Sequence, residues 1–510
     1  MRPAASLPAG FSLHPANHYP PVKRPITTLP LLAFTALNSF ATLAFAGPAA
    51  APPPITPAPA DNPLSFFDGK LVFDVQERLR WEIRENNYDF NDSIRSLTDD
   101  NWIENRFRFG MSLKPAPWLK FYVQGQDSRE YLSDRADIPG VLGAEGDDPV
   151  DLRQGYVEIG NTSEMHWGVK IGRQVLAYGD ERLVGPSEWN NISRTFDAVK
   201  LTYKTAQWSL DAFASTVVLP HREGYNQSDL FNGNETHRDQ VFSGLYFSTT
   251  ALGPQTTDLY VFHLHESFDL PGDTNFFTLG TRFKSKPGIF SHQPPPPHDG
   301  KSVADGKTPP PPPAPPRPIG FDYEGEFAFQ TGDLKGRNLS AFAAHAGLGY
   351  TFDAAWLPRI GVEYNYASGD RDPLDGDVET FQNLFPSNHR FYGQMDAFSW
   401  QNIHDAALLF KVAPTKQLTT RAELHAFWLA STDDVWYRSN GATAVRPLTP
   451  AARAASNFAG FEADLTLSYA ATKWLTLEAG YSHFWAGDYL NDTGAGDDAD
   501  FGYLQATLNF

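Results

Sequence analysis

The chain has 510 residues, no cysteine and a formal net charge of −19, and 14% of its residues are aromatic. The lack of cysteine excludes disulfides and thiolate chemistry, and the acidic balance argues against nucleic acid as a general partner. A mean hydropathy of −0.39 with so many aromatic residues indicates apolar side chains spread regularly along the chain rather than gathered into helices.

The N-terminal part of the chain is typical of an exported protein. Lys23 and Arg24 precede the apolar run 29–46, which ends in the small-x-small sequence Ala-Phe-Ala. Residues 1–46 are therefore predicted to be a Sec-type signal peptide; a membrane-anchoring helix is the alternative, although Thr, Asn and Ser interrupt the run. Residues 47–66 are rich in Pro and Ala and are predicted to be a linker.

From Lys70 onward, apolar and polar residues alternate with a period of two. In residues 71–84, "LVFDVQERLRWEIR", the apolar residues fall on one face and the charged residues on the other, which predicts a strand. The same alternation recurs in residues 106–113, 119–126, 321–330, 345–352, 360–367, 461–469 and 475–484. We count about eighteen such runs, many near the ~9–11 residues that a tilted strand needs to cross a bilayer. Residues 67–510 are predicted to form an all-β, antiparallel transmembrane barrel.

The connections between these runs alternate in length. Short turns on one side and long loops on the other are typical of an outer-membrane barrel, with the turns periplasmic and the loops extracellular. Residues 286–318 break this rule, because a Pro-rich insertion stands where a short turn is expected. It is either a spacer that touches a periplasmic partner or a tolerated disordered insertion.

The last run, 501–510, alternates as far as Phe510. A closed barrel pairs its last strand with its first, because no open edge survives in hydrocarbon. A terminal Phe in such a strand resembles the assembly signal of Gram-negative outer-membrane proteins. This resemblance implies outer-membrane lipid and the barrel-assembly machinery as partners.

Charged residues on the non-apolar face are expected to point into the barrel, since they cost several kcal/mol on the lipid side. The inward cations are predicted to be Arg78, Arg80, Arg84, Arg106, Arg108, Lys120, Arg153, Lys170, Lys200, Arg282 and Arg421. The interleaved acids are Asp74, Glu82, Asp211, Asp322, Glu324, Glu326, Glu363, Glu423, Glu462 and Asp464. The early cluster of arginines would attract an anion such as a polyuronate. The alternative is that these charges neutralise one another across strands.

Residues 152–203 carry the elements "LRQGYVEI", "IGRQ", "YGDERLVG", "WNN" and "TFDAVKL". This segment resembles the alginate export porins of the bacterial outer membrane. The resemblance implies a monomeric barrel of about eighteen strands that exports an anionic polysaccharide passively through an Arg-lined pore, with or without a periplasmic export partner. It implies roles for Arg153 as a lumen cation, for Arg173 in "GRQ", for Asp180 and Arg182 in the following loop, and for Arg194 and Asp197 in the "R-TFDA" element.

That loop, "YGDERLVGPSEWNN", is too polar for lipid. It either folds inward and narrows the channel or packs as an outer loop with structural ion pairs. A general or other-substrate porin for small solutes, and a barrel with a plugged lumen, are the competing functions.

An enzymatic function is not expected. His263, His265, His345, His404 and His425 lack a G-x-S-x-G or comparable nucleophile context, and metal-binding spacing such as H-E-x-x-H is absent. No catalytic residue, metal or cofactor is predicted.

Overall fold

The computed structural model describes residues 63–93, 99–133, 146–221, 224–228, 239–267, 272–286 and 318–510. The predicted signal peptide, nearly all of the predicted linker and the body of the Pro-rich insertion lie outside these residues, so their boundaries stay predictions. No helix in the described part of the chain is long and apolar enough to cross a membrane.

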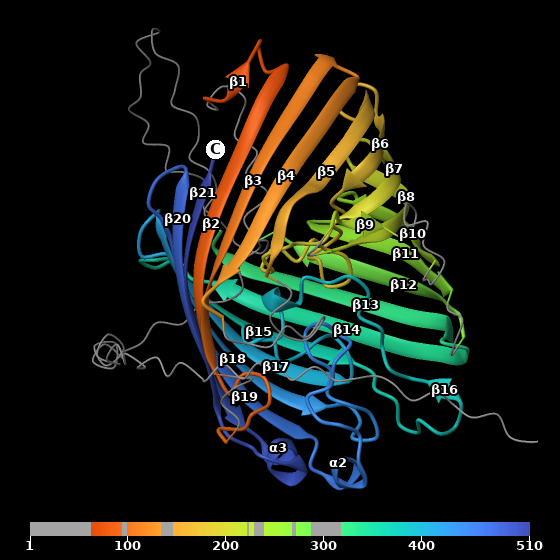
Figure 1. Cartoon of the computed structure of the whole chain (residues 1–510), viewed down its shortest axis with the longest axis vertical. Helices are drawn as coiled ribbons and strands as arrows, with labels where there is room; N and C mark the ends of the chain where they lie inside the picture. The colour runs from red at the N-terminus through yellow and green to blue at the C-terminus, as the bar shows by residue number, and fades with distance from the viewer. Residues whose placement is uncertain are drawn as a thin grey trace, which may run out of the picture. The chain divides into compact units, whose positions relative to one another are not determined.

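The described residues form a barrel of eighteen long antiparallel strands, as predicted (Figure 1). In chain order these are β2 (Leu71–Glu85), β3 (Asp100–Ala116), β4 (Leu119–Tyr131), β5 (Asp148–Asn161), β6 (Trp167–Gln174), β7 (Phe196–Lys204), β8 (Trp208–Leu219), β10 (Asp239–Thr249), β11 (Gln255–Ser267), β12 (Thr274–Ser285), β13 (Gly320–Leu334), β14 (Arg337–Thr351), β15 (Arg359–Ala367), β17 (Ile403–Val412), β18 (Leu418–Leu429), β19 (Phe458–Ala470), β20 (Leu475–Ala486) and β21 (Ala499–Asn509). Three two-residue strands are added, β1 (Ser65–Phe66), β9 (Gln227–Ser228) and β16 (Asp377–Val378). Because β1 pairs with β2, regular pairing begins just ahead of the predicted barrel start at 67.

The barrel closes between its first and last long strands. β2 and β21 pair from Gln76↔Asn509 to Glu85↔Asp500, and Figure 1 shows them side by side in orange and blue. Beyond that ladder, Val75 and Phe510 exchange two backbone hydrogen bonds of 3.2 and 2.9 Å. The seam leaves no unpaired edge between the two strands, which is the condition for a sheet in hydrocarbon.

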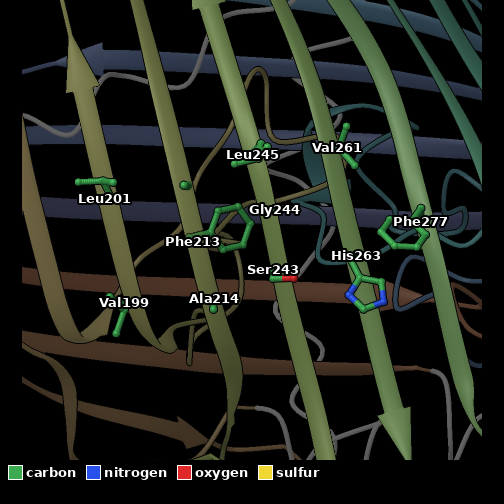
Figure 2. A pocket seen from close by; sticks show the side chains of 11 residues that line it. Val199, Leu201, Phe213, Ala214, Ser243, Gly244, Leu245, Val261, His263 and Phe277 are labelled. Carbon is green, nitrogen blue, oxygen red and sulfur yellow. The ribbon is translucent and has the colours of Figure 1, made fainter.

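The alternation of side chains places apolar groups outside and charged groups inside. On β2, Leu79 and Trp81 are 49% and 38% exposed, whereas the alternate residues Arg78 and Arg80 are 3% and 1% exposed. Figure 2 shows another part of this outer face, an apolar pocket across β7, β8, β10, β11 and β12. This pocket belongs to the lipid-type surface and not to the interior.

The lengths of the connections follow the predicted alternation except on the two sides of β13. Residues 286–319 separate β12 from β13 where a short turn is expected, and only Lys335 and Gly336 join β13 to β14 where a long loop is expected. Both residues have positive φ, 51° and 77°, which is the two-residue hairpin geometry that matches strand twist. The alternation of short turns and long loops therefore describes most connections, but not this hairpin.

Two of the long connections enter the barrel and contact its inward side chains. We call residues 175–195, between β6 and β7, the first inner segment, and residues 380–402, before β17, the second inner segment. The second contains a short 3-10 helix, η4 (Asn388–Arg390), while α2 (Pro450–Ala454) and α3 (Asp488–Thr493) lie in other connections. Both inner segments contribute to a buried apolar core that includes Leu183, Phe385 and Trp400.

Candidate functional site

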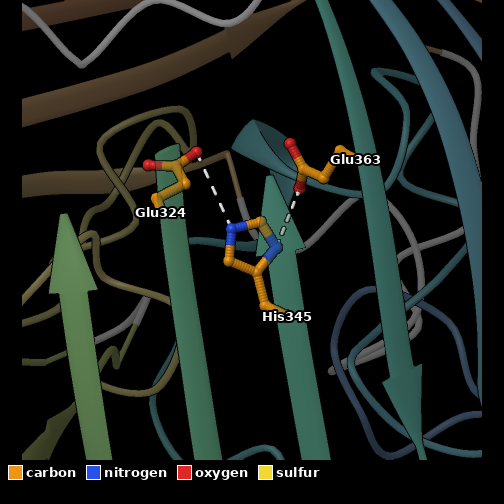
Figure 3. Close-up of side chains that lie close together, drawn as sticks. All are labelled: Glu324, His345 and Glu363. Carbon is orange, nitrogen blue, oxygen red and sulfur yellow. Dashed lines mark ion pairs between the residues drawn. The ribbon is translucent and has the colours of Figure 1, made fainter. Parts of the chain in front are cut away.

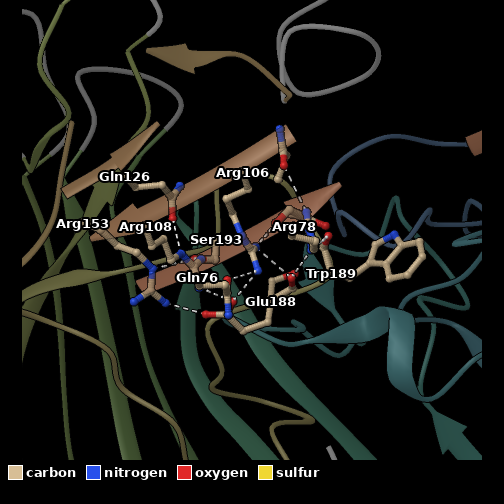
Figure 4. Close-up of polar contacts among 12 residues, drawn as sticks. Gln76, Arg78, Arg106, Arg108, Gln126, Arg153, Glu188, Trp189 and Ser193 are labelled. Atoms are coloured by element: carbon tan, nitrogen blue, oxygen red, sulfur yellow. Dashed lines mark hydrogen bonds and ion pairs between the residues drawn. The ribbon is translucent and has the colours of Figure 1, made fainter. Parts of the chain in front are cut away.

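Five arginines lie together on the inside of β2, β3 and β5, and Figure 4 shows four of them, Arg78, Arg106, Arg108 and Arg153. We call Arg78, Arg80, Arg106, Arg108 and Arg153 the arginine wall; each is at most 9% exposed. The strand registers bring them together, because Arg78 lies opposite Arg106 and Gln76 opposite Arg108. Alternate residues of a strand share a face, so the spacing that predicted inward cations also groups them.

The carboxylate of Glu188, in the first inner segment, is bound by three members of this wall. It lies 2.7 Å from Arg108, 3.2 Å from Arg106 and within ion-pair distance of Arg153. Burial alone would raise the pKa of Glu188, but the charges of Arg108, Arg153 and Arg106 outweigh burial and hold that pKa well below its usual range. The side chain is nevertheless 43% exposed, so part of it is open to solvent.

Backbone carbonyls of the first inner segment take up further donors of the arginine wall. Arg78 donates to the carbonyl oxygens of Glu188 and Trp189 at 2.8 and 2.9 Å, and Arg80 donates to that of Trp189 at 2.7 Å. The Trp189 ring lies 3.7 Å from the Arg80 guanidinium and 3.7 Å from the stacked ring of His389. The segment is thus held by hydrogen bonds, charge and cation–π contact together.

The wall also carries acids of its own. Glu104 on β3 lies 2.5 Å from Arg80 and 3.3 Å from Arg78, and Glu82 lies 2.6 Å from Arg80. Acids of β2 and β3 therefore neutralise part of the charge of Arg78 and Arg80. This agrees with the alternative interpretation of the sequence, in which inward charges neutralise one another across strands.

The first inner segment also forms ion pairs with side chains of β12, β14 and β15, and there it contributes charges of both signs. Asp180 lies 2.7 Å from Arg282 and 3.0 Å from Lys284. Arg182 donates to Glu363 at 2.8 Å and lies 3.1 Å from Nε2 of His345. Figure 3 shows Glu363 and Glu324 on either side of the same imidazole, 3.3 and 3.7 Å away. The segment therefore places an acid against basic strands and a base against acidic strands.

The second inner segment fastens the first. The backbone N–H of Gly185 donates to Phe385, and that of Phe385 donates to Leu183, both at 2.8 Å. Arg194 donates to the carbonyl oxygens of Gly185 and Pro386 at 2.9 Å. The first inner segment is consequently anchored by both its ends and its middle. Of the two arrangements left open by the sequence, these contacts correspond to the inward fold.

The structure distributes the predicted site residues over several places. Arg78, Arg80, Arg106, Arg108 and Arg153 lie together, whereas the remaining members are in separate contacts: Arg173 with Asp197 at 3.0 Å, Arg282 with Asp180, Arg182 with Glu363, Arg194 on two carbonyl groups, Lys170 over the Tyr156 ring at 4.5 Å, and Arg421 beside Glu423 at 3.9 Å.

The sequence did not identify Glu188, Trp189 or the second inner segment. Glu188 lies 80 residues from Arg108 in the chain, and no local pattern distinguishes it from the other acids of its loop. The only usable signal was that the loop is too polar for lipid, which left an inward fold open.

Comparison with known proteins agrees with this architecture. The family model described as alginate export matches residues 71–503. No curated protein matches the sequence.

Solved structures with similar folds include OccK11 (OpdR) of Pseudomonas aeruginosa, with 13% identity and a TM-score of 0.53 over 86% of this chain and 96% of that one. Others are OccK2 (OpdF) from the same organism in complex with glucuronate, with 10% identity and a TM-score of 0.52 over 86% and 98%, and its outer membrane protein OprD, with 10% identity and a TM-score of 0.51 over 86% and 94%. At these identities the likeness concerns the fold alone. The family match, which spans most of the chain, together with the closed eighteen-stranded barrel, establishes that the chain belongs to the alginate export family and is a porin-like channel of the bacterial outer membrane.

Proposed function

We propose that the barrel conducts an anionic polysaccharide or oligosaccharide passively, and that the arginine wall selects for it. The long connections are extracellular and the short turns periplasmic, so that the first inner segment reaches the wall from outside. The residues proposed to line the path are Arg78, Arg80, Arg106, Arg108, Arg153, Lys170, Arg173, Asp180, Arg182, Arg194, Asp197, Arg282 and Arg421.

The observation that carries this proposal is the environment of Glu188. Three buried arginines hold one carboxylate whose side chain is partly exposed. A uronate residue presents the same carboxylate chemistry, and guanidinium groups bind carboxylates with charge-assisted hydrogen bonds. A passing polyuronate would therefore compete with Glu188 for the same donors. The similar barrel of OccK2 was solved with glucuronate, a uronate monomer, which supports this class of solute.

Single-channel recording in planar bilayers tests the proposal. We expect anion-selective current that oligouronates block in a saturable way and that neutral oligosaccharides of equal length do not. Arg108→Gln and Arg153→Gln should weaken the block, because each removes a guanidinium that holds Glu188. Arg371→Gln, at a 72% exposed side chain outside the wall, is the control. If oligouronates do not block the current through the wild-type channel, the proposal of a path for uronates is refuted.

A channel for other small solutes is the second candidate. The pairing of Arg78 and Arg80 with Glu104 and Glu82 favours it, because these acids lower the net charge of the wall. Weakly selective current without uronate block is its expected signature. The absence of any channel current would instead indicate that the inner segments block the lumen of the barrel.

A further inference from the structure

The interior of the barrel contains two clusters of one histidine and two carboxylates. Ligand atoms of Glu324, His345 and Glu363 lie within 4.8 Å of one another, and so do those of Glu423, His425 and Asp464. We call them the His345 cluster and the His425 cluster. They have the same composition but very different surroundings.

The carboxylates of the His345 cluster already form ion pairs with basic side chains of the protein. Arg182 lies 2.8 Å from Glu363, and Lys284 forms an ion pair with Glu324. A guanidinium and an ammonium therefore occupy the space next to its carboxylates. A further cation would have to displace them.

Among the described residues, the carboxylates of the His425 cluster have fewer basic side chains near them. The cations within ion-pair distance of its carboxylates are His425 itself and Arg421, 3.9 Å from Glu423. On the adjoining strands Glu462 and Asp405 add two more acids, fully buried like the cluster's own histidine. Four carboxylates thus share one guanidinium and one imidazole. Buried charge of this kind is costly unless it is paired or bound to a metal.

Several atoms of this cluster are buried without a well-formed hydrogen bond in the described structure. Both carboxylate oxygens of Asp464, which is only 3% exposed, make no well-formed hydrogen bond, although Ser482 and Glu462 interact with this carboxyl group. Oε1 of Glu423, Oε2 of Glu462 and Nε2 of His425 are also without a well-formed hydrogen bond. Buried polar groups without partners are rare in native proteins and call for an explanation such as an ion. These atoms come from the paired positions Glu423↔Asp464 and His425↔Glu462 of β18 and β19, so they converge on one place.

Asp405 orients the imidazole for metal binding. Its Oδ1 lies 3.0 Å from Nδ1 of His425, so this carboxylate favours the tautomer with the proton on Nδ1, in which Nε2 carries the lone pair. Nε2 lies 3.8 Å from Oε2 of Glu423. A carboxylate behind a ligating imidazole is the usual outer partner in metal sites, where it fixes the tautomer.

We propose that the His425 cluster binds a divalent transition-metal cation through Nε2 of His425 and carboxylate oxygens of Glu423 and Asp464. Metal–ligand bonds of about 2.0–2.4 Å allow one ion to bridge atoms up to twice that far apart. An imidazole nitrogen among the ligands favours Zn²⁺ over Mg²⁺ and Ca²⁺, and two carboxylates beside it also suit Mn²⁺. This inference holds whichever solute the channel conducts.

The second inner segment covers the site. The N–H of Met395 donates to Oε1 of Glu462 at 2.9 Å, and Gln394 donates to Thr466 on β19 at 2.6 Å. A side chain at Gly393, which has a φ of 77°, would collide with the carboxyl group of Glu462. The segment therefore closes tightly over the acids, and a cation bound there would join β18, β19 and the segment above them.

The test uses the mature barrel refolded without a polyhistidine tag. The protein is stripped with EDTA, titrated with Zn²⁺ or Mn²⁺, desalted and measured by mass spectrometry of the metal. We expect about one equivalent per chain and a rise in Tm on loading. Asp464→Asn should lose that equivalent, and Asp405→Asn should weaken affinity about 10–100-fold, as outer partners of metal ligands do.

Glu324→Gln is the matched control, because it alters the His345 cluster, where Lys284 already meets the carboxylate. It should keep the full equivalent. Heat-modifiable mobility on gels reports that each variant is folded. If Asp464→Asn does not fold, the wild-type stoichiometry and the Asp405→Asn affinity decide the matter.

Three results would overturn the proposal. One is a wild-type barrel that retains no metal above the stripped level. The second is retention of the metal by folded Asp464→Asn, which would place it elsewhere. The third is equal retention of Ca²⁺ or Mg²⁺ without Zn²⁺ or Mn²⁺, which would contradict the stated cation class.

Discussion

The arginine wall and the His425 cluster are two inward surfaces of the same barrel with opposite charge. The wall joins five arginines with Glu188, a residue from the first inner segment. The cluster joins its acids with one histidine and one distant arginine, and it leaves oxygens without partners. Both surfaces are covered by an inner segment, but over the His425 cluster the second segment contributes hydrogen bonds from Met395 and Gln394, whereas its Asp396 pairs with Arg84 on β2.

This difference shows how a wide barrel can stabilise a charged interior. Strand alternation forces charges inward, and their neutralisation then depends on what the loops contribute. A loop that brings the complementary charge makes a rigid internal contact. A loop that brings neutral donors to the acids, such as the N–H of Met395 and the amide of Gln394, leaves their charge to be balanced by an ion.

The largest expected effect comes from removing the internal cation of the His345 cluster. Arg182→Met would leave Glu363 and His345 buried without their guanidinium and so make this cluster resemble the other. Breaking a buried pair from one side costs about 3–5 kcal/mol of unfolding free energy, to be measured by urea unfolding in lipid vesicles.

Arg371→Met is the matched control for that experiment. Arg371 lies 4.0 Å from Glu379, with side chains 72% and 44% exposed, so about 0–1 kcal/mol is expected. Equal losses in the two variants would contradict the importance of burial here.

A smaller effect on stability, but a clear one on selectivity, is expected for Glu188→Gln. The amide can still accept hydrogen bonds, so the unfolding free energy should fall by only about 1 kcal/mol. Since Arg106, Arg108 and Arg153 lose their carboxylate, the reversal potential in a salt gradient should shift toward anion permeation. Glu379→Gln should leave it unchanged, and a shift toward cations would show that the wall does not face the path.

Trp189→Ala tests how firmly the first inner segment is fixed. It removes the contacts with Arg80 and His389, each 3.7 Å away, which together are worth about 1–2 kcal/mol. Noise in the open-channel current should increase. Trp356→Ala, at a 55% exposed ring in a short turn, should not change the noise.

The smallest effect is expected from moderate acidification. The pKa of Glu188 is held below the ordinary 4.5 of a glutamate, so its stabilising contribution is complete above about that pH and is lost only as the pH falls through the lower folded value. The Tm difference between wild type and Glu188→Gln should stay constant from pH 7 to about 4.5. A step in that difference within this range would contradict the ion pairing.

Local pattern was sufficient to predict the barrel, its strand number and its inward arginines, because a period of two is written into each strand. It could not identify the partner of the arginine wall, since Glu188 meets Arg106 and Arg153 from a loop whose path depends on contacts with the second inner segment. Nor could it distinguish His345 from His425, because their surroundings come from strands far apart in sequence.

The seam between β2 and β21 has a consequence for the order of assembly. Gln76 bonds to Asn509 at 2.9 Å across 433 positions of sequence, and contacts of such separation form late and slowly. β2 supplies two of the five arginines, and its other neighbour is β3. The first long strand must therefore wait for the last one before its second edge is paired, so the part of the arginine wall on β2 is held from both sides only once β21 has been made.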